Sequence, residues 1–272
     1  MPALAKLLRR LDLPRVNEFE FTGGAGIGGT GAPARLYGGL VLAQATVAAA
    51  RTVDGFDMHA LHAMFLRPGR PEVPIRFLVT PVKQGRNFHA RLVTALQGDD
   101  TIFQMQTSFG RRVAAVEHQD VMRELPPPDD DLPNRDKLRG RDPKSMPVEV
   151  RMIDPIIEDA PTSPTTAIWL RANGTLPADP VLHLAVLVYA TDRAFLSTAW
   201  RPHGGKGVMN GASLDHSLWL HDPIDFNDWL LFDMHSPIAR WERGLVQGSL
   251  YARDGRRVAT VAQEGTLSFR KH

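Results

Sequence analysis

Two stretches of this sequence are apolar on every face, and they constrain the fold more than any other feature. The first covers residues 40–50 and the second covers residues 181–190. Asp179 and Pro180 precede the second stretch and supply an N-cap and a first-turn proline. A helix without a polar face must be buried on all sides. We therefore expect each stretch to form a helix that is enclosed by other parts of the chain.

Each apolar stretch is followed by short runs that are typical of antiparallel strands. A further strand-like run, residues 16–22, precedes the first stretch. An antiparallel sheet wrapped around one long apolar helix is the hotdog arrangement, so the predicted fold class is α+β, a double hotdog of two tandem repeats. The strand-like runs cover residues 58–67, 73–82, 88–96 and 101–109 in the first half, and residues 214–221, 229–235, 243–251 and 257–267 in the second.

The two halves show the pattern of an internal duplication. The hairpin-type loops at Asp99 and Asp254 correspond at an offset of 155 residues. His62 corresponds to His216 at an offset of 154, and we expect both histidines to face the core between the repeats. The predicted organisation is an N-terminal hotdog repeat at residues 1–110, a linker rich in proline and charge at 111–146, and a C-terminal hotdog repeat at 147–272.

Charge balance and the absence of cysteine exclude several classes of protein. The chain has 32 basic and 30 acidic residues, a balance that does not favour nucleic acid as a partner. Without cysteine there are no disulfides or thiolate metal sites. No apolar run approaches the roughly 20 residues that a membrane span needs. Residues 1–10 are basic and amphipathic without a cleavage site, so we expect a surface helix and not an export signal. We also expect a cytoplasmic protein that needs no metal or other cofactor.

A glycine-rich loop at residues 23–31 offers a different interpretation. Gly24, Gly26 and Gly29 have the G-x-G-x-x-G spacing of dinucleotide sites. In that fingerprint the glycines open a helix directly, whereas here Pro33 intervenes and the runs that follow look antiparallel. We therefore favour a flexible loop over a nucleotide site.

Six short motifs occur in order along nearly the whole chain. They are RLYGG at 35–39, HAMFLRPG at 62–69, WLRANG at 169–174, YATDRAFL at 189–196, SLDHSLWLH at 213–221 and QEG at 263–265. Together they resemble the bacterial acyl-CoA thioesterase II family, a double-hotdog group with peroxisomal relatives. The resemblance implies an acyl-CoA substrate, hydrolysed to free fatty acid and CoA. It also implies a homo-oligomer, a dimer or tetramer of double hotdogs.

The resemblance further implies a catalytic trio of aspartate, hydroxyl residue and glutamine, and the matching positions are Asp192, Ser213 and Gln263. A carboxylate at the C-terminal end of an apolar helix does not stabilise that helix. Its apolar neighbours should partly desolvate Asp192, which is a setting in which a carboxylate can act as a general base. A hydroxyl and an amide can hold one water between this carboxylate and the thioester carbon.

The substrate-binding candidates are Gly38, Gly39 and Arg67. Backbone N–H groups at a helix start suit a developing negative oxygen, so the glycine pair could bind the carbonyl or the pantetheine arm. Close packing that needs glycine is the alternative. Arg67 could meet the phosphates of CoA. Leu40 departs from the glutamine that the family often has after the paired glycines.

Two other functions stay open at this point: a hotdog hydratase or dehydratase acting on acyl thioesters, and a non-catalytic acyl-CoA-binding protein. The hydratase sites usually pair a histidine with an acid, whereas Asp192 resembles the hydrolase pattern. Ser213, Asp215 and His216 have the residue types of a nucleophilic triad. On a strand, however, Ser213 and Asp215 point away from His216, and no G-x-S-x-G elbow surrounds the serine.

Overall fold

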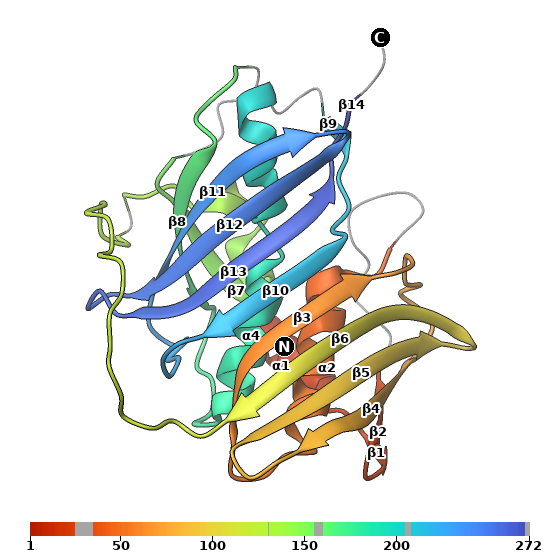
Figure 1. Cartoon of the computed structure of the whole chain (residues 1–272). Helices are drawn as coiled ribbons and strands as arrows, with labels where there is room; N and C mark the ends of the chain where they lie inside the picture. Colours follow the sequence, from red (N-terminus) through yellow and green to blue (C-terminus); the bar gives the residue numbers. More distant parts are fainter. Residues whose placement is uncertain (25–34, 130, 155–159, 205–207, 270–272) are drawn as a thin grey trace.

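One antiparallel sheet curves around two buried helices (Figure 1). The computed structural model describes residues 1–24, 35–129, 131–154, 160–204 and 208–269. The helices are α1 (Ala3–Leu11), α2 (Gly38–Ala50), α3 (Arg135–Leu138) and α4 (Pro180–Thr191), with 3-10 helices η1 (Pro143–Ser145) and η2 (Leu196–His203). The strands are β1 (Arg15–Asn17), β2 (Glu20–Gly23), β3 (Asp57–Phe65), β4 (Ile75–Gln84), β5 (Phe88–Gln97), β6 (Asp100–Gly110), β7 (Val148–Met152), β8 (Thr165–Ala172), β9 (Val208–Asn210), β10 (Asp215–Leu220), β11 (Leu230–Arg240), β12 (Arg243–Ala252), β13 (Arg257–Thr266) and β14 (Ser268–Phe269).

The order of the strands repeats itself about the centre of the sheet. Among the described residues the strand order of the large sheet is β1-β2-β4-β5-β6-β3-β10-β13-β12-β11-β8-β7. The six strands of the second half therefore repeat the arrangement of the first six in the opposite direction across the sheet. β3 and β10 pair side by side at the centre, where the orange and light-blue strands meet in Figure 1. This arrangement confirms the predicted double hotdog.

The burial pattern of the two central strands corrects the predicted register of the repeat. His62 lies opposite Ser217 in the β3–β10 pairing, and its Nδ1 lies 3.1 Å from Ser217 Oγ. The buried positions are Leu61 and Ala63 in β3 but His216 and Leu218 in β10, so the offset is odd, in agreement with the 155 of the hairpin loops, and His62 does not correspond to His216. His62 is exposed while His216 is fully buried, so the expectation that both face the core is wrong for His62. A slip of one residue moves a strand side chain to the opposite face.

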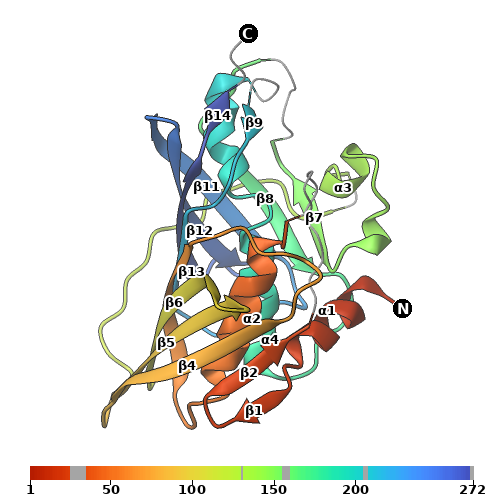
Figure 2. The same cartoon turned by 90° about the vertical axis from the view of Figure 1, so that its right-hand side faces the viewer.

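α2 and α4 lie side by side against the inner face of the sheet (Figure 2). They are buried because almost every one of their side chains is apolar or small. The start of α2 lies against the end of α4, where a Cβ added to Gly39 would lie only 2.7 Å from the Tyr189 carbonyl oxygen. α1 is a surface helix, as predicted, and buries one face through Leu4, Leu7 and Leu11. The helices of the described residues are too short or too polar to span a bilayer.

The chain between β6 and α3 crosses the outer face of the C-terminal part of the sheet (Figure 1). Arg123 forms a bidentate ion pair with Asp233, with both contacts at 2.6 Å. Trp169 Nε1 donates to the carbonyl oxygen of Pro126 at 2.8 Å. A small apolar cluster forms beneath this segment: Ala167, Trp169, Trp229, Leu231 and Tyr251, with Met122, Leu125, Leu132 and Ile153 against it. The segment therefore covers a second, outer core.

The glycine-rich loop lies mostly outside the described residues, which include neither Gly26 nor Gly29. The pairs of strands in the described part of the chain are antiparallel, including β2 with β4. A dinucleotide fingerprint needs a parallel strand-helix-strand unit. The surrounding fold therefore does not support the nucleotide interpretation.

Candidate active site

Asp192, Ser213 and Gln263 come from three separate elements and meet at the end of α4. Asp192 is the C-cap of α4, Ser213 precedes β10, and Gln263 lies in β13. The Oγ of Ser213 and the Nε2 of Gln263 each lie 3.1 Å from Asp192 Oδ1. Gln263 Nε2 also hydrogen-bonds to Ser213 Oγ. The three residues that the sequence singled out are in mutual contact.

The local structure explains why these side chains converge. β13 alternates between faces from Ala259 onward, which turns Gln263 inward, and its side chain is fully buried. Ser213 pairs with Gly265 of the same strand through an isolated bridge, so its hydroxyl lies beside the amide. A buried amide must find hydrogen-bond partners. Gln263 finds them in the carboxylate and the hydroxyl.

The two oxygens of Asp192 have different surroundings. Oδ1 accepts both hydrogen bonds described above. Oδ2 faces the start of α2, since a Cβ added to Gly38 would lie 3.2 Å from it and 2.9 Å from Cε1 of Phe65. A side chain at position 38 would therefore fill the space beside Oδ2. Gly39, in contrast, serves the close packing of α2 on α4, which was the alternative expectation for the pair.

Tyr37 connects the start of α2 to the end of α4, and it is not among the site residues predicted from the sequence. Its hydroxyl donates to the carbonyl oxygen of Tyr189 at 2.8 Å, and the two rings meet edge to face at 5.0 Å. Burial, together with the nearby Asp192 carboxylate, raises the pKa of Tyr37 well above its ordinary value. The hydroxyl therefore stays neutral and remains a donor.

A buried ion pair lies directly behind Asp192. Arg193, the next residue along the chain, pairs with Asp136 of α3, and both side chains are nearly excluded from solvent. Arg135 donates to the carbonyl oxygen of Arg193 at 3.2 Å. Burial, with neighbouring arginines, lowers the pKa of Arg135 to about 9. The segment predicted as a linker thus contributes a carboxylate next to the site.

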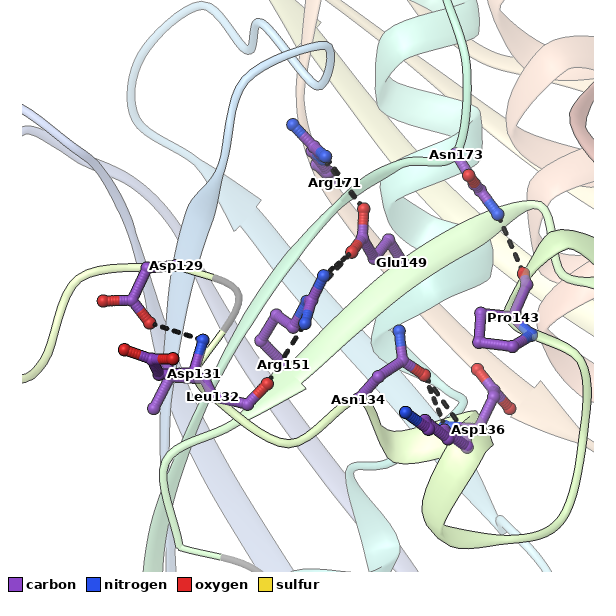
Figure 3. Close-up of polar contacts among 11 residues, drawn as sticks. Asp129, Asp131, Leu132, Asn134, Asp136, Pro143, Glu149, Arg151, Arg171 and Asn173 are labelled. Atoms are coloured by element: carbon purple, nitrogen blue, oxygen red, sulfur yellow. Dashed lines mark hydrogen bonds and ion pairs between the residues drawn. The ribbon is translucent and has the colours of Figure 1, made fainter.

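Figure 3 shows how this segment is held in place. Asn134 caps α3 by accepting from the backbone N–H groups of Asp136 and Lys137 at 3.0 and 3.2 Å. Arg151 of β7 donates to the carbonyl oxygen of Leu132 at 3.2 Å. Asn173, just after β8, donates to the carbonyl oxygen of Pro143 at 2.9 Å. These contacts fix α3 against the C-terminal part of the sheet.

A second layer of polar residues lies behind Gln263. His216 Nδ1 is 3.0 Å from Gln263 Oε1, and His216 Nε2 is 3.2 Å from Thr191 Oγ1. Burial lowers the pKa of His216, although the Asp192 carboxylate acts in the opposite direction. The carboxylate of Asp215 instead accepts from the backbone N–H of Glu264 at 2.7 Å. His216 therefore serves Gln263 and Thr191 and is not arranged as the base of a serine triad.

Arg67 and Leu40 are the remaining residues that the sequence brought forward. Arg67 is exposed, and its Nη1 donates to the carbonyl oxygen of Thr101 at 2.8 Å. Leu40 is fully buried in the main core, where a polar contact has no place. Among the described residues, no three histidine, aspartate or glutamate side chains cluster so as to hold a metal ion.

Comparisons with known proteins show the family of the chain. A family model described as acyl-CoA thioesterase matches residues 159–266, and one described as acyl-CoA thioesterase N-terminal domain matches residues 28–110. The mouse acyl-coenzyme A thioesterase 8 is 36% identical over 87% of this chain and 81% of its own length. The acyl-CoA thioesterase 2 of Haemophilus influenzae is 31% identical over 98% of both chains.

A solved structure extends the similarity to the whole fold. The acyl-CoA thioesterase II of Mycobacterium marinum superposes with a TM-score of 0.83 at 33% identity, covering 97% of this chain and 99% of that one. Sequence relatives and fold thus agree over nearly the full length. The chain belongs to the acyl-CoA thioesterase II family of double-hotdog thioester hydrolases.

Proposed function

We propose that this thioesterase hydrolyses fatty acyl-CoA to free fatty acid and CoA, using a water that Asp192 activates as general base. The observation that carries the proposal is the asymmetry of the carboxylate. Oδ1 accepts hydrogen bonds from Ser213 and Gln263, whereas Oδ2 faces Gly38. A carboxylate held in this way keeps one oxygen for a proton from water.

The reaction follows from this orientation. A water at Oδ2 gives its proton to Asp192 while its oxygen attacks the thioester carbon. The carbonyl oxygen becomes an oxyanion, and the tetrahedral intermediate then collapses with cleavage of the carbon–sulfur bond. The CoA thiolate takes the proton from Asp192, which restores the carboxylate and balances the reaction as acid plus thiol. A positioned general base contributes about 10²–10⁴-fold to such a step.

The start of α2 is the proposed oxyanion site. The first N–H groups of a helix have no partner within that helix, and they carry partial positive charge. α2 begins at Gly38, beside Asp192 Oδ2, so these donors and the base flank the same space. Oriented backbone donors of this kind stabilise developing negative charge strongly. Phe65 adds an apolar wall to this space.

Ser213 and Gln263 position the base more than the water. Both donate to Oδ1, and together they prevent the carboxylate from turning Oδ2 away from α2. Ser213 Oγ accepts from Gln263 and keeps a further lone pair that can receive a hydrogen of the attacking water. The hydratase alternative lacks support, because His216 is fully buried behind Gln263 and cannot reach a substrate.

The test is a thiol-release assay over saturated acyl-CoA substrates of increasing chain length, run in ¹⁸O-water. The proposal predicts turnover of fatty acyl-CoA with one ¹⁸O atom in the released acid. Addition of water to an enoyl-CoA without thiol release would support a hydratase. Tight acyl-CoA binding without turnover would indicate a non-catalytic binding protein, and either result would overturn the proposal.

The predicted oligomer and location stay predictions. We propose that the double hotdog associates as a dimer or tetramer and acts in the cytoplasm. Light scattering at several protein concentrations tests the first point, and cell fractionation tests the second. A mass of one chain at all concentrations would contradict the oligomer.

A further inference from the structure

A chain of hydrogen bonds leads from the last turn of α4 to Asp192, and it begins with Thr191 and His216, two residues that the proposed mechanism does not use. Thr191 Oγ1 lies 3.2 Å from His216 Nε2, and His216 Nδ1 lies 3.0 Å from Gln263 Oε1. Gln263 Nε2 then lies 3.1 Å from Asp192 Oδ1. The side chains of Thr191, His216 and Gln263 are fully buried, so water cannot replace the contacts among these three.

The position of every proton in this chain follows from its end. A carboxylate only accepts hydrogen bonds, so Gln263 must turn its NH₂ group toward Asp192 and its oxygen toward His216. His216 must then carry its proton on Nδ1. Because burial lowers the pKa of His216, the ring is neutral and its Nε2 is an acceptor. Thr191 therefore donates to Nε2, although the Val188 carbonyl oxygen lies 3.0 Å from its hydroxyl.

We propose that His216, as the Nδ1–H tautomer, is a positioning residue that fixes the amide of Gln263 with its NH₂ group toward Asp192 and Ser213. The proposal rests on the proposed function, since it concerns the orientation of the catalytic carboxylate. Without a donor at this place, the buried Oε1 of Gln263 has no hydrogen-bond partner, so the amide is no longer held from both of its ends. A displaced amide would weaken its hydrogen bond to Oδ1, and the carboxylate would lose one of the two donors that orient it.

The N-terminal half indicates that the fold itself does not require this histidine. Ser213 pairs with Gly265 as Met58 pairs with Phe109, an offset of 155 residues between the first partners, and at this offset His216 corresponds to Leu61 of β3. Leu61 is fully buried and pairs with Thr107 of β6, much as His216 lies against Gln263 of β13. A leucine therefore fits the same backbone position. The polar chain at His216 serves something other than packing.

Two substitutions separate positioning from packing. In His216→Asn, the side-chain NH₂ group takes roughly the place of Nδ1–H and can still donate to Gln263, whereas His216→Leu keeps the volume but removes the donor. We expect His216→Leu to lower kcat by about 10–10²-fold with little change in KM, within the range for a misplaced catalytic group. His216→Asn should recover most of that loss. Equal losses in both variants, or wild-type kcat in His216→Leu, would overturn the proposal.

A double substitution gives a readout that packing alone would not move. In a Gln263→Ala background there is no amide to orient, so adding His216→Leu should leave kcat unchanged. A further full loss in that background would show that His216 acts independently of Gln263. Nitrogen NMR of ¹⁵N-histidine protein gives the tautomer directly, and the His216→Asn spectrum assigns the signal. An Nε2–H tautomer would contradict the proposal.

Asp192→Asn keeps the two proposals distinguishable. If Asp192→Asn retains wild-type kcat, the proposed mechanism fails at its base. If Asp192→Asn is inactive while His216→Leu has wild-type kcat, only the positioning role of His216 is lost. Thermal unfolding of each variant confirms that the comparison is made between folded proteins.

Discussion

α2 and α4 end with the same backbone conformation but with side chains of opposite charge. The C-cap of α4 is Asp192 and the C-cap of α2 is Arg51, and both have right-handed helical φ and ψ values. Asp192 lies beside Ser213 and Gln263 at one end of the helix pair. Arg51 lies at the other end, where it donates to the Leu13 carbonyl oxygen at 2.7 Å and pairs with Asp12 near the surface.

The strands beside the two ends of the α2–α4 pair also carry different side chains at equivalent positions. Met58 pairs with Phe109 just as Ser213 pairs with Gly265, so Met58 is the counterpart of Ser213. Two residues before Phe109 stands Thr107, the counterpart of Gln263. Thr107 Oγ1 is buried and has no hydrogen-bond partner among the described residues. The duplicated backbone therefore offers two equivalent places, and one of them carries the proposed catalytic trio.

The end without the trio holds a cavity of about 410 Å³. Apolar side chains of both helices form much of its wall, among them Ala50, Val53, Val181 and Leu184. The carboxylates in its lining have other partners: Asp179 accepts from the backbone N–H of Val181 at 2.9 Å and caps α4, Asp57 pairs with Arg112 at 3.4 Å, and Asp222 pairs with Arg256. Under the proposed mechanism, space for an apolar group is therefore not sufficient for the reaction. The two ends therefore differ in whether a carboxylate is positioned to act as the proposed base.

The largest expected difference in kcat is between variants of the two charged C-caps, Asp192 and Arg51. Asp192→Asn should lower kcat by about 10²–10⁴-fold, because the amide cannot accept the proton of water. Arg51→Gln should leave kcat within about threefold of wild type, since the base lies at the opposite end of the helix pair. Steady-state thiol release by both variants measures the contrast. Equal losses would mean that the ends do not differ in the way described.

The next effect concerns the residues that hold the carboxylate. Ser213→Ala and Gln263→Ala should each lower kcat by about 10–10²-fold, because Oδ1 loses a donor in each case. The double variant should lose less than the product of the two, since both donors orient one group. Asp179→Asn is a matched control that retains a capping side chain. Fully multiplicative losses would contradict a shared role.

A third contrast concerns stability. Asp136→Asn leaves Arg193 buried without its carboxylate, and it should cost about 3–5 kcal/mol of unfolding free energy. Asp12→Asn removes the exposed partner of Arg51 and should cost no more than about 1 kcal/mol. Urea unfolding of the two variants gives the difference. A small loss for Asp136→Asn would show that the ion pair does not anchor the end of α4.

The smallest effect is expected at Thr107. Thr107→Val removes a buried hydroxyl without a partner among the described residues, so it should raise stability by about 1 kcal/mol. Its kcat should equal that of wild type, because this position belongs to the end without the trio. Loss of thioesterase activity in a folded Thr107→Val protein would show that the second end takes part in the reaction.

The sequence predicted the elements with a long apolar run or a clear alternation beside a turn, and it missed β8, whose burial on both faces hides the alternation. α2, α4 and the hairpin strands follow directly from apolar pattern and turn residues. β8 has no clear alternation, because residues 166–170 are buried on both faces, by the main core on one side and by the outer cluster on the other. Such a strand cannot be recognised from alternation.

The same limit applies to the candidate site. Asp192, Ser213 and Gln263 were found through their motifs, which lie far apart along the chain. Asp136 was not found, because a single aspartate in a charged segment gives no sign that Arg193 lies opposite it. His216 was assigned to the wrong counterpart, because two histidines in similar motifs suggested an offset of 154, whereas His62 is exposed and His216 is buried. The partner of Asp136 and the counterpart of His216 both depend on contacts between residues that lie far apart in the sequence.

The most direct test is a crystal structure with a non-hydrolysable acyl-CoA analogue in which a CH₂ group separates the carbonyl from sulfur. The account predicts that the analogue carbonyl lies beside Gly38, with its carbon about 3–3.5 Å from the water that Asp192 Oδ2 binds. A carbonyl at the opposite end, between Met58 and Val181, would contradict the account.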